Sequence, residues 1–286
     1  MIPPEFDYER PSSVEAAVAA VASYGADARV LAGGQSLLPL LKARAIAPKV
    51  LVDIGGLDEL RRIERDGDSV TIGALATQAE VLESAAIGGR FPRLRAGAPL
   101  LGDPVIRNRG TFVGALAFAD PAADWTALAL VLDARLRVRG ATHDRTVPIG
   151  EFLLGAFTTT LAPTEVITHV TILLPAGNST LAYWKVRHPG SGMTLVGAAV
   201  LLDREGDSGD GACRVAITGA GPRAVRVTAV EDALRGERLS PEAIEHAADR
   251  AADGLELLSD EFASSAYRER LARACVRRAL SEARAA

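Results

Sequence analysis

The sequence predicts an α+β fold in which a small parallel unit is followed by a second lobe and a separate C-terminal region. Short apolar strands at 30–32 and 50–54 flank a helix, which is the pattern of a parallel strand–helix–strand unit. Shorter strands and capped helices fill the middle of the chain, and three longer strand patterns followed by helix patterns complete it. We therefore expect segments at 1–55, 56–176 and 177–286.

The first helix is expected to start near residue 13. Ser12 and Glu15 have the spacing of a capping box, and Gly25 is a typical helix end. The apolar residues between them recur at helical spacing, at Val14, Val18 and Val21. Residues 1–10 are expected to be a polar lead-in.

A glycine pair follows the first predicted strand, in the segment RVLAGGQSLLPLLK at 29–42. The pattern predicts a strand at 30–32, a tight turn at the two glycines and a helix at 36–42. Glycines let the backbone approach a ligand, and free amides before a helix hold an anion such as a diphosphate. An ordinary turn is the alternative interpretation. The candidate residues are Ala32, Gly33, Gly34, Gln35, Ser36 and Leu37.

A second candidate segment lies between Pro99 and Asp124, where no long periodic pattern occurs. Gly110, Thr111 and Gly114 offer backbone amides and a hydroxyl, and Asp124 offers an acceptor for a sugar hydroxyl. Ordinary loop and cap chemistry is the alternative for these residue types.

The remaining elements are read from caps and periodicity. We expect a capped helix at 77–84, a buried helix at 125–132 and strands at 70–72, 136–139 and 166–173. Strands are also expected at 181–186, 193–202 and 213–219, followed by a helix capped by Ser240. The final helix has one apolar face, and its arginines are expected to be solvated; docking to an acidic partner is the alternative.

Composition excludes several classes of function. The 286 residues are 48% hydrophobic and carry a net charge of −4, which argues against a nucleic-acid surface. The N-terminus does not have the pattern of a signal peptide and no apolar run is long enough to span a membrane, so we expect a cytoplasmic protein. Two cysteines, Cys213 and Cys275, are too few for an iron–sulfur cluster or a structural zinc site.

No catalytic constellation is visible in the sequence. The four histidines lack metal-ligand spacing, and Ser36 lacks the glycine that a nucleophile elbow would need at position 38. We therefore assign no catalytic residue and no metal ligand. Redox chemistry in this chain would come from an organic cofactor or from another chain.

Taken together, the two candidate segments resemble those of a known family. They resemble the two flavin loops of the FAD-binding medium subunits of molybdenum hydroxylases, such as xanthine dehydrogenase and aerobic carbon monoxide dehydrogenase. AGGQSLLPLLK at 32–42 is similar to the first flavin loop. IRNRGT and ADPAAD, within 106–124, are similar to the second. Further matches are EVI at 165–167, YWKVRHPGSG at 183–192 and YRERLARACVRRAL at 267–280.

This resemblance implies a two-lobed FAD-binding domain of the vanillyl-alcohol-oxidase-like (PCMH) type. It also implies a small C-terminal domain made of a three-stranded antiparallel sheet and a helical bundle. The backbone of residues 32–37 and 110–114 would hold the FAD diphosphate. Asp124 would bind the ribose side, Ile167 would contact the adenine or ribityl region, and Lys185 would lie near the isoalloxazine.

The implied function is that of an electron-transfer flavoprotein subunit, an oxidoreductase without catalytic side chains of its own. A large molybdopterin-binding subunit and a small 2Fe–2S subunit would be its partners, in a dimer of heterotrimers. FAD would pass the electrons to NAD, a quinone or oxygen. A free-standing flavoprotein oxidase and a non-catalytic scaffold with a degraded FAD site are the alternatives.

The second loop departs from the family pattern TIGGN, because Val113 and Ala115 replace the first glycine and the asparagine. If the first glycine adopts a positive φ, a valine there would cost about 1–3 kcal/mol. The lost asparagine amide would remove a hydrogen bond worth about 0.5–1.5 kcal/mol. Together these changes would weaken FAD binding by roughly 10- to 1000-fold.

Overall fold

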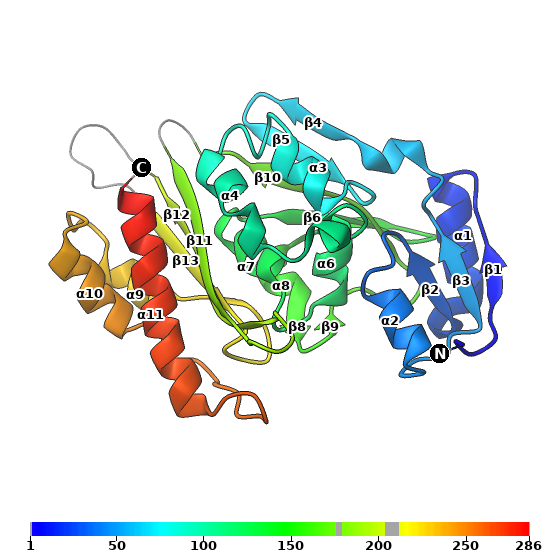
Figure 1. The fold of residues 1–286 in the computed structure, drawn as a ribbon. Coiled ribbons are helices and arrows are strands. Elements are labelled where there is room, and N and C mark those ends of the chain that lie inside the picture. Colours follow the sequence, from blue (N-terminus) through cyan, green and yellow to red (C-terminus); the bar gives the residue numbers. More distant parts are fainter. Residues whose placement is uncertain (1, 176–178, 204–211, 286) are drawn as a thin grey trace.

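The computed structural model describes residues 2–175, 179–203 and 212–285. It contains a small parallel sheet, a five-stranded sheet and a four-stranded C-terminal sheet, with helices between the last two (Figure 1). The expected boundary between residues 176 and 177 lies outside the described residues.

The N-terminal lobe is a parallel three-stranded sheet of order β1-β3-β2, as the strand–helix–strand pattern predicts. Its elements are β1 Asp7–Glu9, α1 Val14–Tyr24, β2 Ala28–Leu31, α2 Leu37–Lys42 and β3 Val50–Asp53. The expected polar lead-in was wrong at β1, which escapes pattern analysis because its three residues are polar and mostly exposed. The cap of α1 is Ser13 rather than Ser12, since the Ala16 amide donates to the Ser13 hydroxyl at 3.1 Å.

The second lobe is an antiparallel sheet of order β4-β5-β10-β6-β7. Its strands are β4 Ile63–Asp66, β5 Ser69–Gly73, β6 Arg135–Arg139, β7 Asp144–Pro148 and β10 Val166–Leu173, with a small hairpin of β8 Leu153–Gly155 and β9 Thr158–Thr159. Its helices are α3 Gln78–Glu83, α4 Pro92–Ala96, α5 Pro104–Arg107, α6 Phe112–Phe118, α7 Asp124–Val131 and α8 Ile149–Phe152. Thr77 and Glu80 form the capping box of α3.

The C-terminal region has the expected three long antiparallel strands and a two-residue fourth strand. They are β11 Thr180–Arg187, β12 Thr194–Leu202, β13 Cys213–Thr218 and β14 Val225–Arg226, followed by α9 Thr228–Ala233, α10 Pro241–Asp249 and α11 Ser265–Arg284. Helix α11 packs on β11 and β12, and the buried residues between them form a second hydrophobic core.

Helix α7 joins the two larger parts of the molecule. All eight of its residues are buried, and it packs against β12 and β13 of the C-terminal sheet. A helix that is apolar on every side is stable only when it is enclosed. The C-terminal sheet therefore has α11 on one face and α7 of the second lobe on the other (Figure 1).

The expectation that the arginines of the last helix are solvated was wrong for Arg268, which is 4% exposed. Its guanidinium donates to the carbonyls of Leu195 and Gly219 at 2.8 and 2.6 Å and forms an ion pair with Asp260 at 2.6 Å. It thus ties α11 to the strands below it. Helical periodicity does not reveal such a partner, because all three acceptors are distant or lie in loops.

Candidate functional site

A cavity of about 640 Å³ lies between the N-terminal lobe and the second lobe. The first glycine loop, the second loop and the start of β10 line it. Ten of the predicted residues are among the lining residues: Ala32, Gly33, Gly34, Gln35, Ser36, Leu37, Gly110, Thr111, Gly114 and Ile167. A volume of this size is typical of a site for a cofactor or other small molecule.

Close contact between the two loops explains the glycines. A Cβ built on Gly33 would stand 2.1 Å from the carbonyl oxygen of Arg109, so any larger residue would force the loops apart. Gly34 has a φ of 75°, in the left-handed region that glycine adopts without strain. The backbone geometry thus requires both glycines of the pair.

The first loop presents a run of backbone amides without acceptors. Among the residues that the structure describes, no hydrogen bond is made by the amides from Gly33 to Leu37, whereas the Leu38 amide donates to Gly34. Buried or partly buried amides normally find a partner. Five successive donors that line a cavity therefore fit a bound anion, the diphosphate of a dinucleotide being one.

The second loop is partly helical, because Thr111 caps α6 by accepting a hydrogen bond from the Gly114 amide at 3.0 Å. Val113 is a helical residue of α6 and is not among the residues with positive φ, so the backbone strain predicted for it was wrong. Phe112 does not fill the cavity. It is 1% exposed and packs edge-on against Trp125, with ring centroids 5.3 Å apart.

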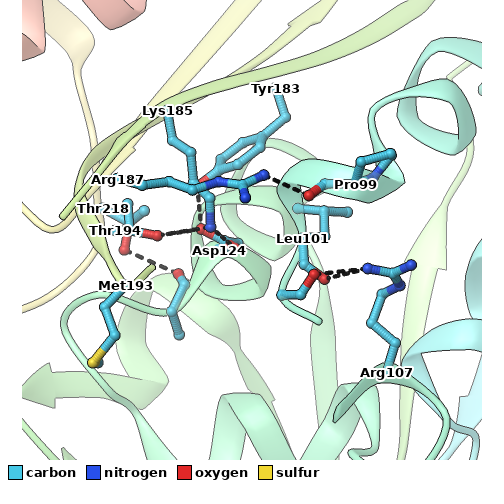
Figure 2. Close-up of polar contacts among 12 residues, drawn as sticks. Pro99, Leu101, Arg107, Asp124, Tyr183, Lys185, Arg187, Met193, Thr194 and Thr218 are labelled. Atoms are coloured by element: carbon cyan, nitrogen blue, oxygen red, sulfur yellow. Dashed lines mark hydrogen bonds and ion pairs between the residues drawn. The ribbon is translucent and has the colours of Figure 1, made fainter. Parts of the chain in front are cut away.

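Asp124 and Lys185 lie together, and neither is among the residues that line the cavity. Their side chains are 9% and 3% exposed, and Lys185 Nζ lies 2.6 Å from an Asp124 carboxylate oxygen. Tyr183 and Thr194 also donate to this carboxylate (Figure 2). Burial and the neighbouring Asp124 raise the pKa of Tyr183 well above its usual value, so the phenol stays a donor. The predicted contacts of Asp124 and Lys185 with FAD stay predictions.

The charges around the cavity are few. Arg29 and Glu165 are the only ionisable residues that line it among those described, and Arg29 donates to the carbonyls of Ala26 and Ala28. Arg145 donates two hydrogen bonds to the Glu165 carboxylate and lowers its pKa. An anion in the cavity would therefore be held by neutral donors, mainly backbone amides.

Sequence reasoning missed Gln78, Phe118 and Phe157, which also line the cavity. The two phenylalanine rings pack with centroids 5.0 Å apart, and Phe157 is 60% exposed with a φ of 53°. Residues between 78 and 157 meet here only through tertiary folding. Within the sequence, the glutamine directly after a helix cap was the one available signal for Gln78.

Neither metal nor thiol chemistry is indicated in the described part of the chain. No group of three metal-binding side chains occurs there. In the same described residues, no helix is both long and apolar enough to cross a membrane. Cys213 and Cys275 are unpaired, and burial raises the pKa of each thiol to about 12. Neither is a reactive thiolate at neutral pH.

Comparisons with known proteins agree with this geometry. The family described as FAD binding domain in molybdopterin dehydrogenase matches residues 4–175, and the CO dehydrogenase flavoprotein C-terminal domain matches residues 182–283. The chain is 36% identical to the carbon monoxide dehydrogenase medium chain of Hydrogenophaga pseudoflava, covering 99% of this chain and 98% of the relative. It is 35% identical to the nicotine 6-hydroxylase medium subunit of Paenarthrobacter nicotinovorans, covering 98% of both.

Solved structures show the same likeness. The carbon monoxide dehydrogenase from Hydrogenophaga pseudoflava that lacks the Mo-pyranopterin moiety of its cofactor matches with a TM-score of 0.94 and 37% identity, over 100% of this chain and 99% of that chain. Quinoline 2-oxidoreductase from Pseudomonas putida 86 matches with a TM-score of 0.91 and 31% identity, over 99% and 98%.

The fold and the cavity define an FAD-binding flavoprotein with a two-lobed domain of the PCMH type and a C-terminal domain. The chain belongs to the family of FAD-binding medium subunits of molybdenum hydroxylases, of the carbon monoxide dehydrogenase and xanthine dehydrogenase type. It is an oxidoreductase subunit whose cofactor is FAD.

Proposed function

We propose that the cavity binds FAD with the diphosphate between the first glycine loop and the start of α6. The observation that carries this proposal is the run of five unpaired amides, Gly33 to Leu37, along the cavity wall. The five main-chain amides can donate hydrogen bonds to the several oxygen atoms of a diphosphate, and such binding needs no cationic side chain. Gly110, Thr111 and Gly114 face the same space from the second loop, and Ile167 lines it from β10.

We further propose that the chain transfers electrons within a larger complex. FAD supplies the electron-accepting and electron-donating chemistry, while this chain binds it and excludes competing reactions. The partners would be a large molybdopterin-binding subunit, which oxidises the substrate, and a small 2Fe–2S subunit, which relays electrons to FAD. Support comes from the relatives, which are named medium chains or medium subunits.

Several finer features belong to the same proposal. The electron acceptor would be NAD, a quinone or oxygen, and the complex would be a dimer of heterotrimers in the cytoplasm. Within the chain, we propose the division into residues 1–55, 56–176 and 177–286 as two FAD-domain lobes and a C-terminal domain.

Titration of the purified chain with FAD tests the cofactor site, with flavin fluorescence as the readout. Saturable binding in the micromolar range or tighter is expected. No saturable binding at tens of micromolar would contradict the proposal and favour the scaffold alternative. Flavin that stays with the protein pellet after acid precipitation would instead favour an oxidase with a covalent flavin; none of the described histidines or cysteines lines the cavity.

Coexpression with candidate partner subunits tests electron transfer. The flavin absorption of the purified complex should bleach anaerobically on addition of a substrate of the molybdenum subunit, and carbon monoxide and nicotine are the first two to try because relatives are named for them. A complex that oxidises its substrate and reduces its acceptor at full rate without this chain would contradict the proposal.

A further inference from the structure

Gln78 is a buried polar residue whose side chain lacks a partner. It is the first residue of α3, is 8% exposed and lines the cavity. Its side-chain amide makes no hydrogen bond with any residue that the structure describes, although its backbone amide donates to the Gly110 carbonyl at 2.9 Å. The nitrogen and oxygen of this amide are not closed off from solvent, so both are free to bond to a molecule that enters the cavity.

The Gln78 side chain lies where the two loops meet. A Cβ built on Gly110 would stand 3.2 Å from Gln78 Nε2 and 3.4 Å from Gln35 Cγ. Two backbone hydrogen bonds hold α3 to the second loop at this point. The Gln78 amide donates to the Gly110 carbonyl, and the Phe112 amide donates to the Ala76 carbonyl at 3.1 Å. The Gln78 side-chain amide thus lies beside both loops. Because Gly110 has no side chain, the amide fits between them.

The chemistry of this point favours a donor without charge. Phosphate oxygens in an ester-linked diphosphate only accept hydrogen bonds, and the glutamine amide supplies two N–H groups. Among the described residues, Arg29 is the one cation that lines the cavity. Its guanidinium already donates to the carbonyls of Ala26 and Ala28. A side-chain donor therefore adds to the backbone amides of Gly33 to Leu37.

We infer that Gln78 is an FAD-binding residue whose side-chain amide donates a hydrogen bond to the diphosphate, between the Gly33–Leu37 loop and Gly110. This inference rests on the proposed diphosphate position. It gives Gln78 a role in affinity that no match to a flavin-loop motif assigns to it, because it lies outside both loops.

Two substitutions of similar size test the inference. Gln78→Met removes both donors, and Gln78→Glu replaces them with a negative charge. A hydrogen bond to a charged acceptor predicts that Gln78→Met weakens FAD binding about 10- to 100-fold, with Gln78→Glu weaker still. ADP, which carries the diphosphate without the flavin, should lose affinity by the same factor. Glu83→Gln, on the exposed side of the same helix, is the control and should bind FAD like the wild type.

Thermal unfolding of the FAD-free variants separates binding from stability. The Gln78 side chain has no partner among the residues that the structure describes and methionine is of similar size, so Gln78→Met should keep the melting temperature while it loses FAD. If the wild type binds FAD and either variant binds FAD or ADP within twofold of it, the role of Gln78 is wrong and the cofactor site stands. If the wild type does not bind FAD, the proposed site itself fails.

Discussion

Lys185 Nζ lies 2.6 Å from a carboxylate oxygen of Asp124, and this pair joins β11 of the C-terminal sheet to the first residue of α7. Thr194 donates to the other carboxylate oxygen at 2.7 Å (Figure 2). One strand further, the Thr218 hydroxyl contacts the carbonyls of Pro121 and Ala123. The residues that lead from α6 into α7 are therefore held by the C-terminal sheet.

Breaking this pair should destabilise the chain. Lys185→Met leaves a buried carboxylate without its counter-ion, so we expect the free energy of unfolding to fall by about 3 kcal/mol. Urea unfolding measures this change. The double variant Lys185→Met with Asp124→Asn should lose less than the sum of the single variants, because neither charge is then left alone. A loss below about 0.5 kcal/mol for Lys185→Met would show that the pair is not a structural link.

Gly33→Ala should separate the two loops of the FAD site. The added methyl group would stand 2.1 Å from the Arg109 carbonyl oxygen, which forces the backbone to move. We expect FAD affinity, measured by fluorescence titration, to fall more than about tenfold. Gly155→Ala is the control, since a Cβ at Gly155 meets nothing within 4 Å. Equal FAD affinity of Gly33→Ala and the wild type would contradict the contact.

Ala115→Asn should strengthen FAD binding. Ala115 lines the cavity in α6, and asparagine stands at this place in the family pattern. A restored hydrogen bond is worth about 0.5–1.5 kcal/mol, or roughly 2- to 12-fold in the dissociation constant. Val113→Gly should bring no such gain, since Val113 is helical and unstrained and glycine weakens a helix. A gain from Val113→Gly that exceeds the gain from Ala115→Asn would reverse this interpretation.

Glu165 should make stability depend on pH in the acid range. Its pKa is lowered by the hydrogen bonds from Arg145, so the folded state binds the proton more weakly than the unfolded state. The stabilisation, on the order of 1 kcal/mol, is present above the ordinary glutamate pKa and is lost as pH falls through the lower folded value. Urea unfolding of Glu165→Gln and the wild type at pH 7 and at successively lower pH should show a difference that shrinks below about pH 4.5. A difference that does not change with pH would contradict this origin.

Local signals determined much of the fold. The glycine pair after an apolar strand, the capped helix that begins after Thr77 and the Ser240 cap of α10 are each set by neighbours in the sequence. Backbone sterics and cap hydrogen bonds act over a few residues, so these features are readable from the chain itself. The resemblance in the two loops then supplied the family and the cofactor.

Only the tertiary structure decided which of these features meet. It brought Gly33 against Arg109, gave Arg268 its buried acceptors, paired Asp124 with Lys185 and left the Gln78 amide unpaired beside Gly110. These partners lie from 32 to more than 70 residues apart, and no local pattern records a contact over such a distance. The packing of the two lobes and the C-terminal sheet decides which of these residues come into contact. A side chain takes its final position only when the surrounding chain has packed around it.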